Sequence, residues 1–178
     1  MSSKKHYVIT SITLGIIAAA SGLLIGGTNL ITKGQIARNE VNKINSGIVE
    51  IFGKTATISS EFTVEGRKYT NYAYEVKLGD SAAKACALKT SGSNMYGKIS
   101  LLIGFNSTSS SAGPVFNGLS IVINEQTYAT TLMENYVDPL NEGTRDLDDV
   151  SCGATYGAKL IRDMVNEAKE VAKEIFGE

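Results

Sequence analysis

The N-terminal part of the chain has one long stretch without any charged residue, from Tyr7 to Ile31. A helix needs roughly 20 apolar residues to cross a bilayer, and this stretch is longer than that. A cleaved signal peptide has a shorter apolar region that ends at small residues, whereas this run continues beyond Ala18–Ser21. A buried helix of a soluble domain is the remaining alternative, and the absence of a polar face argues against it. We therefore predict a retained transmembrane helix over residues 7–31.

The basic residues around this stretch do not decide its orientation, because Lys4 and Lys5 precede it and Lys33 and Arg38 follow it. We adopt the default orientation of a single-pass protein of the cell membrane. A tail of residues 1–6 then lies in the cytoplasm, and the main domain lies outside the cytoplasm.

Residues 32–53 are predicted to form a juxtamembrane helix that continues from the membrane. Ile44, Ile48 and Phe52 recur close to helical spacing, with charged residues between them. Gly53 is a typical end for such a helix. Residues 54–178 are then left as the main extracytoplasmic domain.

The composition excludes several classes of function. A net charge of -1 in 178 residues gives no excess of basic residues, which argues against a nucleic-acid-binding protein. The single histidine, His6, lies in the N-terminal tail, which argues against a histidine-based triad or metal site. Cys86 and Cys152 do not have a metal-type spacing. Redox chemistry in this chain would therefore require a cofactor.

The main domain has the pattern of an α+β fold. Its last part, residues 158–176, has one apolar and one charged stripe, which predicts a helix that packs on a sheet. Residues 125–141 are loosely helical, and Pro139 predicts that this helix stops near Val137 or Asp138. An antiparallel sheet of about five strands is expected between the first and last helices, with a loop at residues 91–94 and a turn at residues 106–113. The predicted strands are residues 56–64, 69–78, 84–90, 96–105 and 115–124.

The segment from Asp146 to Tyr156 lies directly before the last helix and ends in small residues and a hydroxyl. Thr155 falls at or just before the first helical turn, where free N–H groups and the helix dipole favour an anion such as phosphate. The alternative is that the Thr155 hydroxyl simply caps the helix. The acidic residues at 146, 148 and 149 allow either a cation site or a solvated turn, and the turn is the simpler interpretation.

The order Asp149, Cys152, Gly153, Ala154, Thr155 resembles the covalent-flavin motif of FMN-binding domains in bacterial redox-driven ion pumps. That motif is an acidic residue, two variable positions, Ser or Thr, and then Gly-Ala-Thr. The family includes the G subunit of the Rnf electron-transport complex and the C subunit of the sodium-pumping NADH:quinone reductase. The resemblance implies that FMN is joined to Thr155 through a phosphoester bond, installed by an FAD:protein FMN transferase.

The resemblance also implies a function. The chain would be an electron-carrying flavoprotein subunit of an Rnf-type translocase that pumps Na⁺ or H⁺. It would act with the other membrane subunits, without catalytic residues, metal ligands or independent turnover of its own. The residues implied to bind the flavin, besides Thr155, are Asp149, Cys152, Gly153, Ala154, Tyr156, Thr127 and Tyr128.

The sequence departs from the family at three places near the flavin, one of which is Tyr156-Gly157, where Ser or Thr is common. Cys152 replaces the usual Ser or Thr. Residues 126–131 replace a Glu-Thr-Pro-Gly-Leu-Gly loop, of which only Thr127 is retained, and Tyr128 is a candidate to stack on the isoalloxazine ring instead.

Two other functions stay open at this point. One is a flavinylated extracellular electron-transfer protein outside any ion pump, and the other is a membrane-tethered binding domain without a cofactor. The state of Cys86 and Cys152 is also open, since an extracytoplasmic location permits either a disulfide or two free thiols.

Overall fold

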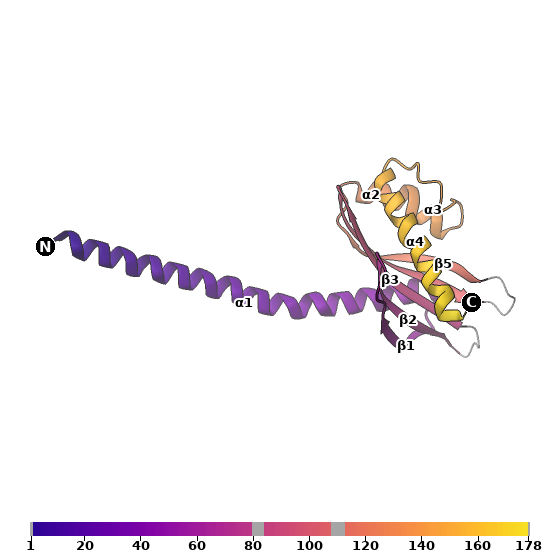
Figure 1. Cartoon of the computed structure of the whole chain (residues 1–178), viewed down its shortest axis with the longest axis horizontal. Helices are drawn as coiled ribbons and strands as arrows, with labels where there is room; N and C mark the ends of the chain where they lie inside the picture. Colours follow the sequence, from indigo (N-terminus) through magenta and orange to yellow (C-terminus); the bar gives the residue numbers. More distant parts are fainter. Residues whose placement is uncertain (1, 80–83, 108–112, 178) are drawn as a thin grey trace. The chain divides into compact units, whose positions relative to one another are not determined.

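The structure, a computed structural model, describes residues 2–79, 84–107 and 113–177, without the side chains of residues 2–12, 25, 28–34 and 36–37. The chain divides into two compact units, Met1–Val41 and Asn42–Glu178. Helix α1 runs from Ser2 to Phe52, so its C-terminal part belongs to the second unit. Figure 1 labels helices α1 to α4 and strands β1, β2, β3 and β5.

Helix α1 covers both helical segments predicted at the N-terminus. The helix predicted for residues 32–53 ends at Phe52, and Gly53 follows with a φ of +93°. In the part of the chain that the structure describes, no helix has the length and hydropathy that crossing a membrane requires. The transmembrane character predicted for residues 7–31 is therefore not confirmed.

The second unit is built on one five-stranded antiparallel sheet in which neighbours in sequence are neighbours in space, β1-β2-β3-β4-β5. This confirms the predicted α+β class and the predicted number of strands. The turn predicted between the last two strands falls largely on residues 108–112, which lie outside the described residues. The strands are β1 (Ala56–Thr63), β2 (Thr70–Leu78), β3 (Lys84–Asn94), β4 (Gly97–Ser107) and β5 (Pro114–Asn124).

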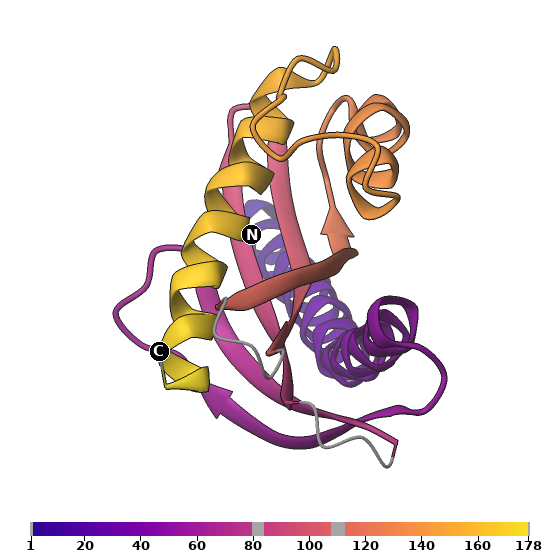
Figure 2. The ribbon, with the colours of Figure 1, turned by 90° about the vertical axis from the view of Figure 1, so that its right-hand side faces the viewer.

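Helices cover both faces of this sheet, as Figure 2 shows. Helix α4 (Thr155–Phe176) packs on one face, and the end of α1, through Ile44 and Ile48, packs on the other. Because side chains alternate along a strand, Leu101 of β4 faces α4 whereas Leu102 faces α1. This explains why β4 is a continuous apolar run, as expected for a central strand that is covered on both sides.

The loop predicted for residues 91–94 is wrong, because β3 pairs with β4 without interruption as far as Asn94 opposite Gly97. The glycine in this segment makes room for packing and does not form a turn. A Cβ on Gly92 would lie 2.9 Å from Cδ1 of Leu160 on α4. The tight turn therefore comes later, at Met95 and Tyr96.

The predicted helix stop near Val137 is also wrong. Helix α2 (Ala129–Leu132) passes into a π-helical turn, η1 (Met133–Val137), and then into α3 (Asp138–Asn141), which contains Pro139. A proline within an α-helix clashes with the carbonyl four residues earlier and gives it no hydrogen bond. The wider π turn directly before Pro139 loosens this part of the helix, so the chain stays helical to Asn141.

Glu167 of α4 anchors the start of β2. Its carboxylate accepts hydrogen bonds from the N–H groups of Lys68, Tyr69 and Thr70, at 2.9, 2.8 and 2.7 Å, and from the Thr70 hydroxyl at 3.0 Å. Burial alone raises the pKa of this carboxyl, but the hydrogen bonds outweigh it and lower the pKa below its ordinary value. The ionised carboxylate therefore stabilises the folded state.

We expect Glu167→Gln to lower the free energy of unfolding at pH 7 by about 2 kcal/mol, because hydrogen bonds to a charged acceptor are lost. The folded-state pKa is lowered, so this stabilisation is present above the unfolded-state pKa and disappears as pH falls through the folded-state pKa. Urea unfolding of both proteins between pH 7 and pH 3 should therefore show the two curves converging in acid. Glu170→Gln is the matched control, because Glu170 is exposed and pairs only with Lys173 in the described ion pairs. A gap between wild type and Glu167→Gln that stays constant with pH would contradict this role.

Candidate functional site

A pocket of about 350 Å³ lies at the N-terminal end of α4. The turn between β3 and β4 and the loop between β5 and α2 complete its walls. The volume is at the lower end of the range usual for small-molecule sites. The lining residues are Tyr96, Gln126, Tyr128, Leu132, Gly153, Ala154, Thr155, Tyr156 and Gly157.

Three tyrosines form an aromatic cluster at this pocket. The ring of Tyr96 lies 5.8 Å from that of Tyr128, nearly edge to face, and 5.5 Å from that of Tyr156, with the planes tilted by 47°. Tyr128 and Tyr156 are 53% and 57% exposed, which is unusual for large aromatic side chains. The cluster therefore presents aromatic surface to a ligand as well as to itself.

A polar network fixes the walls that carry these rings. The Asn94 side-chain oxygen accepts hydrogen bonds from Nε2 of the buried Gln126 at 3.1 Å and from the N–H of Tyr96 at 2.8 Å. Asn94 Nδ2 donates to the carbonyl of Tyr156 at 3.1 Å, and Gln126 Nε2 also donates to the carbonyl of Gly97 at 2.5 Å. One asparagine thus connects the strand turn, the loop before α2 and the start of α4.

Thr155 is the first residue of α4 and is half-buried. The N-cap position belongs to Ala154, and no side chain caps it, so the alternative in which Thr155 caps the helix is wrong. The first N–H groups of a helix have no acceptor inside the helix, and its dipole is positive at this end. No acidic residue lies in the first turn. The hydroxyl of Thr155 therefore stands beside donors suited to an anion.

Two glycines shape the approach to Thr155. Gly153 has a φ of +82°, which a residue with a side chain rarely adopts, and it lets the chain turn into α4. Gly157 brings α4 against α2, since a Cβ there would lie 2.8 Å from Cδ2 of Leu132. Both positions are therefore restricted to residues without a bulky side chain.

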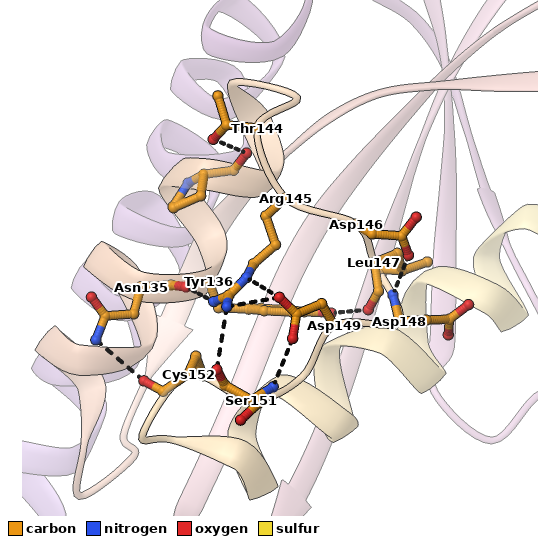
Figure 3. Close-up of polar contacts among 11 residues, drawn as sticks. Asn135, Tyr136, Thr144, Arg145, Asp146, Leu147, Asp148, Asp149, Ser151 and Cys152 are labelled. Carbon is orange, nitrogen blue, oxygen red and sulfur yellow. Dashed lines mark hydrogen bonds and ion pairs between the residues drawn. The ribbon is translucent and has the colours of Figure 1, made fainter.

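The loop before α4 is held by polar contacts, which Figure 3 shows. Asp149 Oδ2 pairs with Nη2 of Arg145 at 2.9 Å. The Asp146 carboxylate serves a turn of the loop, since it accepts a hydrogen bond from the N–H of Asp148 at 2.8 Å. Within the described residues, no group of three or more His, Cys, Asp or Glu side chains is placed to hold a metal ion.

The structure brings only some of the predicted flavin-binding residues to the pocket. Asp149 and Cys152 are not among its lining residues; Cys152 is buried in the cluster under α4. Thr127 is exposed and is also absent from the lining residues; its N–H donates to the carbonyl of Tyr96 at 2.9 Å. The predicted residues that do line the pocket are Tyr128, Gly153, Ala154, Thr155 and Tyr156.

Sequence reasoning missed four lining residues, namely Tyr96, Gln126, Leu132 and Gly157. The strand predicted for residues 96–105 begins one residue later, because Tyr96 lies in the two-residue turn before β4. An aromatic residue next to a glycine in a tight turn is a usable signal for a binding site. Gln126 belongs to the loop at residues 126–131 that the resemblance puts near the flavin. Leu132 carries no such signal, because only the fold places it opposite Thr155.

Both cysteines are free and buried. Burial raises the pKa of the Cys86 thiol to about 12, so it stays protonated and unreactive near neutral pH. Of the two states left open by the sequence, the structure has the two free thiols.

One comparison with known proteins matched the N-terminal part of the chain. Residues 1–50 match the family model described as the RnfG N-terminal region. Comparison with curated proteins and with solved structures gave no match. The family match supports an RnfG-type subunit of an Rnf-type complex, in agreement with the resemblance of the Gly-Ala-Thr segment, which lies outside the matched residues.

Proposed function

We propose that this RnfG-type subunit carries electrons through an FMN that is covalently bound to Thr155. The observation that carries the proposal is the position of Thr155. It is the first residue of an uncapped helix, and it lines a pocket that also contains an aromatic cluster. A hydroxyl for attachment, donors for a phosphate and aromatic surface for a ring are thereby combined in one place.

The residues present fit FMN. The N–H groups at the start of α4 suit the phosphate. Gly153 and Ala154 put no bulk beside the Thr155 oxygen, and Tyr96, Tyr128 and Tyr156 offer π surface to a planar ring. A pocket of about 350 Å³ is open enough for the ring to be partly exposed to a redox partner.

Attachment is a group transfer from FAD. The Thr155 oxygen forms a bond to the phosphorus of the FMN half, the P–O bond of the pyrophosphate breaks, and AMP leaves with the bonding electron pair. The hydroxyl proton passes to a base of the transferase or to water. This chain contributes the hydroxyl and its placement, and the FAD:protein FMN transferase contributes the catalysis.

Bound FMN supplies one- and two-electron chemistry that no side chain of this protein has. The protein's own part would be to hold the FMN and to orient its ring. Asn94 and Gln126 keep the two walls together, and Leu132 closes the buried side of the pocket against water. In an Rnf-type pump the electrons would come from and return to other membrane subunits, coupled to movement of Na⁺ or H⁺.

Membership of an Rnf-type complex favours association with the membrane. We propose the uncharged stretch from Tyr7 to Ile31 as the anchor, with the second unit outside the cytoplasm. Resistance of the full chain to alkaline carbonate extraction, together with protease access to the second unit in intact cells, is the expected result. Release of the chain by carbonate would contradict the anchor without affecting the flavin proposal.

The flavin proposal is tested by producing the full chain with and without an FAD:protein FMN transferase. With the transferase, we expect the intact mass to rise by one FMN less one water, and the band to fluoresce in a denaturing gel. Without the transferase, neither signal should appear. An unchanged mass in both samples would reject the flavoprotein and favour a binding domain without a cofactor.

A further inference from the structure

Pro139 leaves the helical segment before the motif loop with a carbonyl that cannot receive its α-helical hydrogen bond. Proline has no N–H, so the carbonyl four residues earlier, that of Asn135, has no donor at position 139. In the structure, Nη1 of Arg145 donates to this carbonyl. The loop that follows α3 thus folds back on the helix through one arginine.

The same guanidinium also holds the motif loop. Arg145 donates to Oδ2 of Asp149 from Nε at 3.1 Å and from Nη2 at 2.9 Å, and Nη2 also donates to the carbonyl of Ser151 at 3.2 Å. Only 19% of the Arg145 side chain is exposed. A planar group with several donors in fixed directions can satisfy these acceptors together, which an ammonium group cannot do in the same geometry.

Two further contacts join the loop to the same helical turn, as Figure 3 shows. Asn135 Nδ2 donates to the carbonyl of Cys152 at 3.2 Å, and the Tyr136 hydroxyl donates to the carbonyl of Leu147 at 2.5 Å. Residues 146–154 contain neither helix nor strand. These side chains therefore supply much of the order that secondary structure supplies elsewhere.

We propose that Arg145 is a positioning residue for the modification of Thr155. The proposal rests on the proposed function and deepens it. By tying Asp149 and Ser151 to Asn135 of η1, the turn that directly follows α2, Arg145 fixes the loop that leads into Gly153 and so presents the Thr155 hydroxyl in one orientation. Transfer to a hydroxyl requires such prior orientation, since a small misplacement of the reacting atom lowers the rate strongly. Asp149, which does not line the pocket, then acts through Arg145.

The test measures FMN transfer from FAD to the purified full chain in detergent, by an FAD:protein FMN transferase, with the chain as the varied substrate. For Arg145→Gln we expect kcat to fall about tenfold, because charge-assisted hydrogen bonds that orient the hydroxyl are lost. The KM for the chain should stay near the wild-type value. Arg145→Lys, which keeps the charge but not the planar fork, should recover part of the rate.

The matched control is Arg67→Gln. Arg67 also forms a long-range ion pair, with Glu174, but at the other end of α4. Its rate should equal that of wild type. A double-mutant cycle adds Asp149→Asn: if Arg145 acts through Asp149, Arg145→Gln should have a smaller effect in that background.

The split between kcat and KM separates positioning from folding. Partial unfolding removes competent substrate, which raises the apparent KM and leaves kcat unchanged, and that outcome would overturn the proposal. A wild-type kcat in Arg145→Gln would overturn it as well. If Arg145→Gln does not fold, Arg145→Lys carries the test, with kcat expected about threefold lower and an unchanged kcat overturning the proposal. If wild type itself is not modified, the proposed function fails and the role of Arg145 fails with it. If wild type is modified and Arg145→Gln is modified at the same rate, only the role of Arg145 fails.

Discussion

Thr155→Ala is expected to abolish covalent flavin attachment completely. Alanine has no oxygen to form the phosphoester, while its size and helix propensity leave the start of α4 intact. Intact mass after incubation with FAD and the transferase should be that of the unmodified chain, and fluorescence in a denaturing gel should be absent.

Two controls make this result specific. Thr155→Ser keeps a hydroxyl at the same position and should still be modified, more slowly, because serine lacks the methyl group that restricts the rotamer. Thr63→Ala removes an exposed hydroxyl from β1, away from the lining of the pocket, and should be modified like wild type. A full mass gain in Thr155→Ala would assign the attachment to another residue.

Leu132→Ala is expected to cause the largest loss of stability among these variants, about 2–5 kcal/mol. Leu132 is fully buried, belongs to the core cluster under α4 and lies against Gly157. Its removal leaves a cavity between α2 and α4 that rigid neighbours fill only in part. Urea unfolding of the full chain in detergent measures the change.

Val115→Ala is the control, because Val115 is 45% exposed and the substitution should cost much less. The cavity at position 132 also opens the floor of the pocket. We therefore expect flavin attached to the Leu132→Ala variant to be more accessible to an aqueous quencher such as iodide than flavin on wild type. Equal stability of the two variants would show that α2 does not pack against α4 through Leu132 as described.

Much of the fold follows from local patterns. The apolar stripe of α4 and the alternating strands are set by which residues face the core, and the sequence carries that information at short range. Two predictions of local structure were wrong, the loop at residues 91–94 and the helix end before Pro139. In both places a glycine or proline that usually interrupts a strand or helix is accommodated by contacts with other parts of the chain. Gly92 admits Leu160, and Pro139 is accommodated by a π turn whose free carbonyl is taken by Arg145.

The candidate site divides in the same way. The sequence by itself placed Gly153, Ala154 and Thr155 directly before an amphipathic helix, and the resemblance of this segment to the covalent-flavin motif led us to propose Thr155 as the attachment residue. Only the tertiary structure decided what surrounds it. Tyr96, Gln126 and Leu132 reach Thr155 from a strand turn, a loop and another helix, and Arg145 orders the loop from outside the pocket. Contacts between residues so far apart in sequence depend on how α4 and the sheet pack, and no local pattern encodes that packing.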